Sequence, residues 1–242
     1  MTRANILVFE PDSTGHQIEA IHHILAGLEQ QVPGVNVVLL TSAEAQAHPN
    51  CRKLAQDFGH LMTVRIAPMP TRSSRVFRTL GAYMHSQWLN AERLSAGLRE
   101  IGPDNIDFVL IPHMESVGLV QLALRPTLCG GKPWATLAAT LRFHLRQAGV
   151  RAPFRWLDLL YRALFHSVLR HPRLICFASF DPYLQQTIRH SRIVYCPVHG
   201  EPPPRSPVAD ARRFYGIRPE SRVVLVYGFL DYRKSIDVLL VL

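Results

Sequence analysis

The sequence predicts an α/β protein built on a Rossmann-like parallel sheet with helices on both faces. Short, continuously apolar runs alternate along the chain with longer stretches in which apolar residues recur at helical spacing. The apolar runs are rich in Val, Leu and Ile, which is typical of strands covered on both faces. Strands and helices that alternate at short intervals require crossover connections, and these connections build a parallel sheet.

The predicted elements follow one another in a regular order. An apolar run at residues 5–11 is followed by a turn that contains Gly15 and by helical spacing from Ile18 onward, which indicates a strand, a glycine turn and a helix. Further strands are predicted at 35–40, 62–67, 108–112, 134–139, 174–178 and 193–197. Helices are predicted between them at 52–58, 86–101, 117–124, 154–169 and 182–189. Together these elements predict one complete Rossmann-like domain over residues 1–200.

A proline-rich stretch at 201–207 follows this domain. Consecutive prolines remove backbone donors and favour an extended path, so the stretch is predicted to be a linker. Beyond it, residues 208–242 contain one apolar strand at 222–226 and a helix that begins at 234. A single strand and helix cannot enclose a core of their own. Residues 208–242 are therefore expected to pack against the first domain or against sequence that is missing from a truncated chain.

Composition and charge narrow the class of protein. The chain is 48% hydrophobic and 19% charged, which fits a folded protein rather than a disordered one. Its first apolar run is too short for a signal peptide or a membrane span, so a cytoplasmic protein is expected. The four cysteines form no C-x-x-C pair and the histidines show no metal-binding spacing, so no metal is expected. The net charge of +9 favours anionic partners, but no nucleic-acid-binding signature is present.

Two turns at the predicted carboxyl ends of strands could carry chemistry. The first contains Gly15 and His16, where a ligand could approach the backbone and the amides of the following helix. The second contains His113 and Glu115, which suit activation of a hydroxyl group or binding of a sugar. Ordinary helix caps would explain both turns equally well. His113 is the candidate catalytic residue, and Gly15, His16 and Glu115 are candidates for an acceptor or donor loop.

The helix predicted from residue 154 has a basic face and an apolar face. The basic face carries Arg155, Arg162, His166 and Arg170, and the apolar face carries Trp156, Leu157, Leu160, Leu164 and Val168. Such a helix could lie on an anionic membrane surface, with the protein peripheral on the inner face of the membrane. A solvated basic face above a buried apolar face is the more common arrangement for a surface helix.

The tail at residues 222–242 carries the most specific motif of the chain. Gly228 ends an apolar strand, Arg233 and Lys234 follow in a short loop, and an apolar helix comes next. This arrangement resembles the start of the C-terminal domain in GT-B-type glycosyltransferases, especially the family-4-type retaining enzymes. The resemblance implies that residues 1–200 form the acceptor-side domain. It also implies that residues 208–242 are the first strand and helix of a second, nucleotide-sugar-binding Rossmann-like domain.

The resemblance implies a retaining glycosyltransferase that moves a sugar from a nucleotide-sugar to a sugar or lipid-linked acceptor, without a metal or other cofactor. Gly228, Arg233 and Lys234 would bind the donor diphosphate, whose charge paired cations neutralise. Phe229 and Ser235 depart from the family pattern, in which Arg and Gly are common at these positions. The family's paired-glutamate motif lies beyond the last residue of the chain, so weak or no activity is expected from residues 1–242.

Two other functions stay open on the sequence. One is a non-catalytic partner-binding or membrane-surface module that retains the N-terminal Rossmann-like fold. The other is a different enzyme with two Rossmann-like domains, such as a sugar-nucleotide epimerase.

Overall fold

The computed structural model describes residues 4–12, 17–68, 80–139, 141–149, 156–197, 212–213, 216–218 and 220–221. The chain divides into two units, residues 1–198 and residues 199–242, and each is described by itself. In the second unit, Nη1 of Arg212 donates hydrogen bonds to the carbonyl oxygens of Arg218 (2.7 Å) and Ser221 (3.1 Å). The predicted linker at 201–207 and the predicted strand at 222–226 lie outside the described residues.

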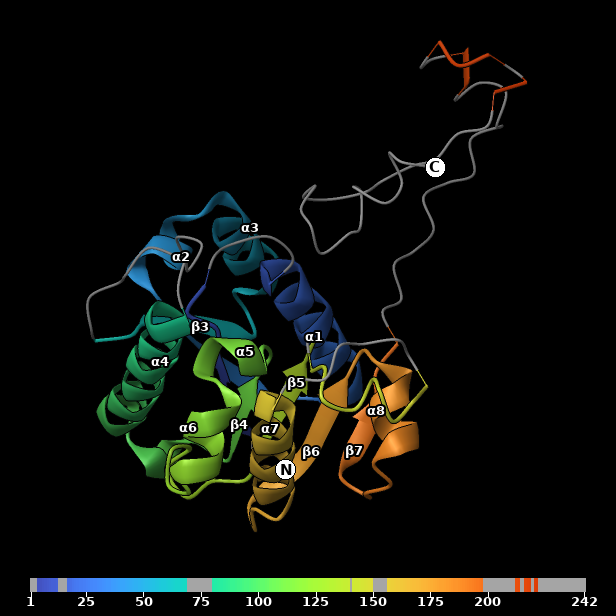
Figure 1. Cartoon of the computed structure of the whole chain (residues 1–242). Helices are drawn as coiled ribbons and strands as arrows, with labels where there is room; N and C mark the ends of the chain where they lie inside the picture. Colours follow the sequence, from blue (N-terminus) through green and yellow to red (C-terminus); the bar gives the residue numbers. More distant parts are fainter. Residues whose placement is uncertain are drawn as a thin grey trace. The chain divides into compact units, whose positions relative to one another are not determined.

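The described part of the first unit is built on a seven-stranded sheet in which all pairs of neighbours are parallel, which confirms the predicted fold class. The strands are β1 (Asn5–Phe9), β2 (Asn36–Thr41), β3 (Met62–Ile66), β4 (Phe108–Ile111), β5 (Trp134–Ala138), β6 (Leu174–Ser179) and β7 (Ile193–Tyr195). They lie in the order β3-β2-β1-β4-β5-β6-β7 (Figure 1). The chain therefore winds outward from β1 to β3 and then returns to add β4 on the other side of β1.

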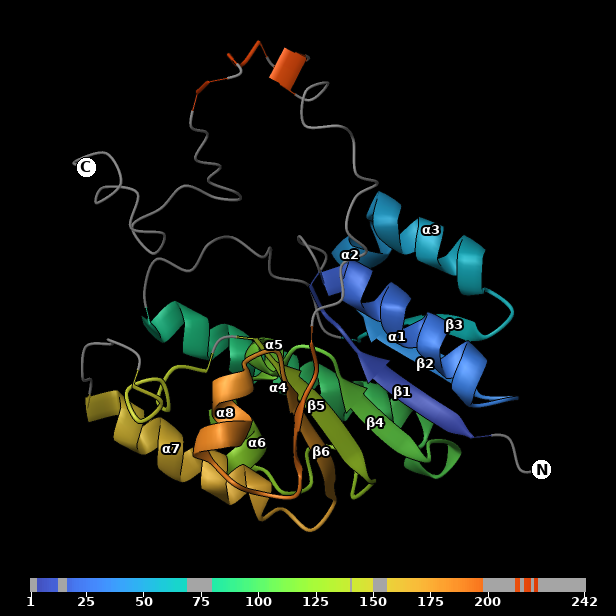
Figure 2. The ribbon, with the colours of Figure 1, turned by 90° about the vertical axis from the view of Figure 1, so that its right-hand side faces the viewer.

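Helices cover both faces of this sheet. They are α1 (Gln17–Gln31), α2 (Ala43–Ala47), α3 (Pro49–Phe58), α4 (Leu80–Ile101), η1 (Pro103–Asn105), α5 (Met114–Val117), α6 (Leu119–Leu124), α7 (Trp156–Leu169) and α8 (Pro182–Thr187). One hydrophobic cluster joins α1 and α3 to the sheet, and a larger one joins α4, α6 and α7 to it. Figure 2 shows these two helical layers with the sheet between them. None of the helices in the described ranges is long and apolar enough to cross a membrane.

The larger cluster is packed around aromatic side chains. Trp134 on β5, Phe177 on β6 and Phe165 on α7 are fully buried, and the rings of Phe165 and Phe177 meet edge-on with centroids 4.8 Å apart. Such contacts stabilise beyond the area that they bury. On α4, a Cβ placed on Gly97 would lie 2.4 Å from Cδ2 of Leu40. Glycine at this position therefore lets α4 lie close over β2.

The helix α7 buries a different face from the one that the sequence predicts. Phe165, Val168 and Leu169 are buried, whereas Trp156 and Leu160 are 70% and 47% exposed. Helical spacing shows which residues share a face, but packing decides which face meets the sheet. The fully buried residues of α7 lie in its C-terminal half, whereas Leu157, Asp158 and Tyr161 of its N-terminal half line a pocket. The predicted buried apolar face is therefore wrong for the first two turns.

Candidate functional site

The strand order places the ends of β1 and β4 side by side. These two strands pair in parallel, with Val8 beside Leu110, so they end at the same edge of the sheet. The direction of winding reverses between them, and ligands of open α/β sheets bind at such a point. Glu10 directly follows β1, and His113 lies two residues beyond β4 at the start of α5.

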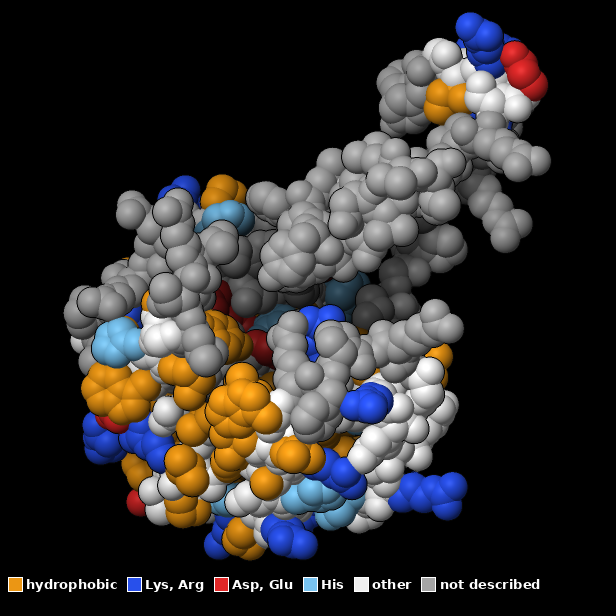
Figure 3. Space-filling model, in the orientation of Figure 1, with side chains coloured by type: hydrophobic (Ala, Val, Ile, Leu, Met, Phe, Trp, Pro, Cys, Tyr) orange, Lys and Arg blue, Asp and Glu red, His pale blue; other side chains and the backbone are white. Residues whose placement is uncertain are grey.

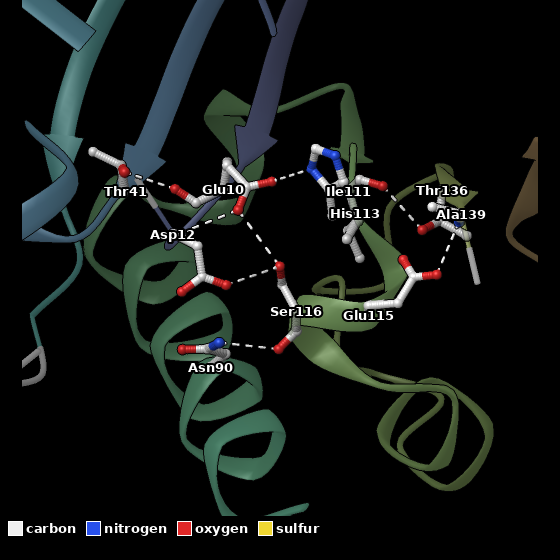
Figure 4. Close-up of polar contacts among 10 residues, drawn as sticks. All are labelled: Glu10, Asp12, Thr41, Asn90, Ile111, His113, Glu115, Ser116, Thr136 and Ala139. Atoms are coloured by element: carbon white, nitrogen blue, oxygen red, sulfur yellow. Dashed lines mark hydrogen bonds and ion pairs between the residues drawn. The ribbon is translucent and has the colours of Figure 1, made fainter. Parts of the chain in front are cut away.

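A buried ion pair joins these two segments, which are 103 residues apart in the sequence. Nδ1 of His113 lies 2.5 Å from Oε2 of Glu10 (Figure 4). Glu10 is 0% exposed and His113 is 5% exposed. The Glu10 amide donates to the carbonyl oxygen of Leu40 (3.1 Å), and the Glu10 carbonyl oxygen accepts from the hydroxyl of Thr41 (2.6 Å). The end of β2 therefore fixes the backbone that carries the carboxylate.

Asp12 and Ser116 extend this polar cluster. The hydroxyl of Ser116 lies 3.3 Å from Oδ2 of Asp12 and 3.5 Å from Oε1 of Glu10, and the Asp12 amide donates to the same Oε1 at 3.1 Å (Figure 4). From α4, Nδ2 of Asn90 donates to the carbonyl oxygen of Ser116 (3.0 Å). Nη1 of Arg93 donates to Oδ1 of Asn90 (2.7 Å). Polar groups from three segments thus bond to one another, as buried polar groups must.

Burial shifts the proton affinity of the cluster. It raises the pKa of Glu10, against the hydrogen bond and the charge of His113. It lowers the pKa of His113, but the hydrogen bond and negative charge of Glu10 outweigh burial, so the net shift is upward. Burial also raises the pKa of Asp12, against the hydrogen bond from Ser116 and the charge of Arg93. All three groups hold a proton more tightly than they do in water, so the cluster is suited to taking one up.

The pair of Glu10 and His113 has the arrangement of a general base with its orienting carboxylate. A carboxylate at Nδ1 fixes the plane of the imidazole and places the proton of the neutral ring on Nδ1. Nε2 then becomes the atom that accepts a proton, and the carboxylate stabilises the imidazolium that forms. The site can therefore deprotonate a hydroxyl group that reaches Nε2.

A pocket of about 250 Å³ lies between α4, α5, the segment 141–143 and α7. Its walls combine apolar and aromatic side chains with two carboxylates and one guanidinium: Tyr83, Gln87, Met114, Glu115, Leu119, Leu141, Arg142, Phe143, Leu157, Asp158 and Tyr161. Met114 and Glu115, which directly follow His113 in the sequence, line the pocket, so the pocket begins beside the buried pair. Apolar walls with a few charged groups are typical of small-ligand sites.

The helix α5 shapes this pocket through Glu115. Oε1 of Glu115 accepts a hydrogen bond from the amide of Ala139 at 2.8 Å (Figure 4), and its carbonyl oxygen accepts from Nε2 of Gln87 at 3.0 Å. Burial and the charge of Glu115 raise the pKa of Tyr83 to about 12, which keeps that hydroxyl protonated. Gly118 ends α5 at φ +88°, and a Cβ there would lie 2.3 Å from Oε1 of Gln87. Glycine is required here both by the backbone angle and by the close approach of Gln87.

The structure brings together two of the residues that the sequence singled out. His113 and Glu115 lie at the same edge of the sheet, one in the buried pair and the other in the pocket wall. Gly15 and His16 lie outside the described residues. The same holds for the predicted diphosphate-binding residues, which are Gly228, Arg233 and Lys234.

Sequence reasoning missed the partner of His113. Glu10 ends the apolar run of β1, where an acidic residue is easily assigned to the turn that follows. The signal was its position, since a carboxylate directly after a buried parallel strand lies at the ligand-binding edge of the sheet. Asp12 and Ser116 carried the same signal. Each lies within roughly two helical turns of the end of a strand, and both strands end at this edge of the sheet.

A second histidine pair lies beyond the ends of β5 and β6. His144 is fully buried, and its Nε2 lies 2.7 Å from Oδ2 of Asp181. Among the described residues, no hydrogen-bond partner meets its buried Nδ1. Asp181 also caps α8, since Oδ1 accepts from the amide of Tyr183 (2.9 Å). No group of three His, Cys, Asp or Glu that could hold a metal ion occurs in the part of the chain that the structure describes.

The sequence matches no protein-family model and no curated protein. Solved structures with a similar fold exist. The structure of Phytolacca americana apo UGT2 has a TM-score of 0.54 and 13% identity, over 89% of this chain and 55% of that chain. The structure of the same UGT2 complexed with UDP-2fluoro-glucose and pterostilbene has a TM-score of 0.51 and 16% identity, over 90% and 58%. A UDP-glucosyltransferase from Polygonum tinctorium has a TM-score of 0.50 and 8% identity, over 87% and 56%.

The likeness is one of fold. The parallel sheet and its two helical layers are arranged as in UDP-glucosyltransferases, which supports a glycosyltransferase-type fold. The chain spans little more than half the length of these structures, 55% to 58%.

Proposed function

We propose that the first unit binds the acceptor in a glycosyltransferase and that His113 activates the acceptor hydroxyl. The observation that carries this proposal is the buried pair of Glu10 and His113 beside a pocket, at the point where the winding of the sheet reverses. The fold shared with UDP-glucosyltransferases supports a sugar-transfer reaction over other uses of such a pair.

The proposed reaction moves a sugar from a nucleotide-sugar to a hydroxyl group in the pocket. Nε2 of His113 takes the proton of the hydroxyl, and the negative charge of Glu10 stabilises the imidazolium. The acceptor oxygen forms a bond to the anomeric carbon of the sugar. The bond from that carbon to the diphosphate breaks, and the nucleoside diphosphate leaves with the electron pair. Retention of the anomeric configuration, which the resemblance of the tail implies, requires the acceptor oxygen to attack from the same face of the sugar that the diphosphate leaves.

The donor side of the proposal rests on the tail of the chain. Arg233 and Lys234 neutralise the diphosphate, and Gly228 gives it room at the end of a strand. The two cations take the role that a metal ion has in other transferases, so the proposed reaction uses none. These three residues lie outside the described ones, and the proposal for them is carried by the sequence motif alone.

The partners in this proposal are a nucleotide-sugar, a sugar or lipid-linked acceptor, and an anionic membrane surface on the cytoplasmic side. The alternative is a non-catalytic membrane-surface module with the same fold. One observation favours contact with a membrane in either case, namely the exposed Trp156 and Leu160 on α7. Dependence of sugar transfer on His113 distinguishes the two, because a module without catalysis does not need a general base.

A transfer assay tests the role of His113. Residues 1–242 are incubated with a panel of nucleotide-sugars and octyl glucoside, and release of the nucleoside diphosphate is measured. Slow release is expected from the wild type, and His113→Asn should reduce it by about 100-fold or more, the usual contribution of a general base. His23→Asn, on the exposed side of α1, is the matched control and should leave release unchanged. Equal release from the wild type and from His113→Asn would contradict the proposal.

A titration tests the pairing of His113 with Glu10 separately. In Glu10→Gln the amide keeps the shape of the side chain but lacks the charge. The pKa of His113 should then fall, because burial lowers it and the negative charge that outweighed burial is gone. The imidazole signals are followed by NMR between pH 4 and pH 9, with His23 as the internal control. An unchanged or higher pKa of His113 would show that Glu10 does not hold the proton on the ring.

A further inference from the structure

The outer face of α7 exposes apolar side chains that the core does not use. We define this face by Trp156, Leu159, Leu160 and Ala163, which share one side of the helix and are exposed. Trp156 is 70% exposed, Leu159 61% and Leu160 47%. Figure 3 shows hydrophobic side chains gathered over α4, α6 and α7, with Lys and Arg side chains around their edge. Contiguous apolar surface of this kind marks a binding surface.

Basic side chains flank the outer face. Arg162 and Arg170 lie on α7 and at its end, and both are at least partly exposed. His166 stands between them, and after burial the charges of Arg162 and Arg170 are what lower its pKa. Arg162, His166 and Arg170 recur at helical spacing and therefore lie along one side of the helix. Asp158 is the acidic residue of α7, and it faces the pocket.

The same helix forms a wall of the pocket. Leu157, Asp158 and Tyr161 line the pocket, and Trp156 and Leu160 lie on the outer face one residue away from them. Whatever contacts the outer face is thus separated from the pocket by the thickness of one helix, about 10 Å. The surface and the pocket belong to one structural element.

We propose that the outer face of α7 lies in the interface of an anionic membrane and brings the pocket to lipid-carried acceptors. Trp and Leu side chains enter the boundary between headgroups and acyl chains, and Arg162 and Arg170 meet the anionic headgroups. The statement about the acceptor rests on the proposed sugar transfer, whereas the statement about the membrane does not.

A second copy of the chain fits this face less well than a membrane does. Two copies joined through α7 would bring Arg162 and Arg170 of each copy close to those of the other. Like charges at an interface oppose association, whereas anionic headgroups offset the same charges. The net charge of +9 extends this preference to the whole chain.

Co-sedimentation with vesicles tests the membrane contact. Vesicles of phosphatidylcholine with roughly 30% phosphatidylserine, anionic like the cytoplasmic leaflet, are compared with vesicles of phosphatidylcholine alone. The wild type should bind the anionic vesicles, and Leu159→Ser/Leu160→Ser should reduce the partition coefficient by about tenfold or more, because two leucines no longer leave water. Arg162→Glu/Arg170→Glu should reduce it by a similar factor and weaken its dependence on salt.

Val194→Ser is the matched control for this experiment. Ile193 lies beside Phe177, whose ring contacts α7, so the next residue, Val194, points to the opposite face of the sheet. Val194 is exposed to a similar degree as Leu160, and its replacement should leave vesicle binding unchanged. Unchanged melting temperatures of all variants confirm that the fold is intact.

Two results would overturn the membrane proposal. One is equal partition of the wild type and the leucine variant, including the case in which neither binds. The other is a dimer in sedimentation velocity that the leucine variant abolishes, which would assign the face to a second copy. Either result leaves the transfer assay with His113→Asn unaffected, so failure of the membrane contact is distinguishable from failure of the proposed reaction.

A transfer assay with dodecyl glucoside in anionic vesicles and free glucose tests the acceptor class. The wild type should prefer the vesicle-bound glucoside by about tenfold or more, and the leucine variant should lose this preference while its rate with glucose stays the same. No preference in a wild type that transfers sugar would contradict a lipid-carried acceptor. Transfer to glucose that His113→Asn leaves unchanged would contradict the proposed function itself.

Discussion

The end of β1 and the outer face of α7 depart from the usual distribution of side chains in opposite directions. At the end of β1 the charged Glu10 is completely buried, and on α7 the large apolar Trp156 is 70% exposed. Buried carboxylates and exposed tryptophans are both uncommon in soluble domains. The difference lies in their partners. Glu10 has its hydrogen-bond partners inside the unit, whereas the proposed partner of Trp156 is a membrane surface.

This comparison separates two kinds of function. A group that is buried with its partners is held in one position, which suits chemistry that depends on distance and orientation. A group that is exposed on a regular helix is available over a broad surface, which suits docking. Both departures lie around one pocket, because Glu115 near the buried pair and Tyr161 on α7 line it together. Substitutions can show whether side chains in the two regions contribute differently to the free energy of unfolding, as their burial differs.

The largest effect is expected from Glu10→Ala. Removal of one partner of a buried ion pair leaves the other charge uncompensated, so the free energy of unfolding should fall by about 3–5 kcal/mol in urea denaturation. Glu29→Ala is the control, because Glu29 forms a similar pair with His60 at 2.6 Å on the surface and should contribute about 0–1 kcal/mol. Similar losses in the two variants would show that burial of Glu10 has no special energetic role.

The loss in Glu10→Ala should also depend on pH. The pKa of His113 is raised in the folded protein, so its contribution to stability is present below its ordinary value of 6.5 and is lost as pH rises through the folded value. The pKa of Glu10 is raised as well, which acts in the same direction. The difference between wild type and variant should therefore shrink as pH rises above 6.5.

An intermediate loss of stability is expected from Gly118→Ala, at the end of the helix that lines the pocket. The backbone angle of +88° is strained for alanine, and the new methyl group meets the amide of Gln87. The free energy of unfolding should fall by about 1–3 kcal/mol in the same measurement. Gly27→Ala on α1 is the control, since nothing lies within 4 Å of the added carbon, and it should gain about 0.5–1 kcal/mol. A neutral Gly118→Ala would mean that this turn is not needed to hold Gln87 against α5.

The smallest effect on stability is expected from Leu159→Ser/Leu160→Ser. These side chains are exposed, so the free energy of unfolding should change by about 0.5 kcal/mol or less for each. Leu169→Ala on the inner face of the same helix is the contrast, and it should destabilise by about 2–5 kcal/mol. A large loss in the serine variant would show that the outer face is already covered within the protein.

The sequence predicted the sheet well because buried parallel strands leave a strong local pattern. Continuous apolar runs marked β2 and β4, and helical spacing from Ile18 onward marked α1. Boundaries were less accurate. The helix α4 begins at Leu80 rather than at the predicted residue 86, although Leu80, Tyr83 and Met84 already stand at helical spacing. The order of the strands, which decides where the site lies, leaves no local pattern at all.

The candidate site was predicted only in part for the same reason. His113 and Glu115 were found because they follow a strand end, a local feature. The bond from His113 to Glu10 could not be found, since it depends on β1 and β4 being neighbours across 103 residues. On α7, spacing identified an apolar face, but a pocket and not the core lies beneath the first two turns. Residues that stand near strand ends could therefore be identified from the sequence, but contacts between distant segments could not.

The hydrogen bond from the amide of Ala139 to Glu115 has a consequence for how selectivity could change. The Glu115 carboxylate faces the pocket and also holds the chain just after β5. That chain continues into Leu141 and Phe143, which line the pocket as well. A substitution of Glu115 would alter the charge met by a ligand and release the neighbouring wall at the same time. A substitution of Glu115 would thus change ligand selectivity by a large amount at once, whereas substitutions of Arg142 or Asp158 would permit smaller changes.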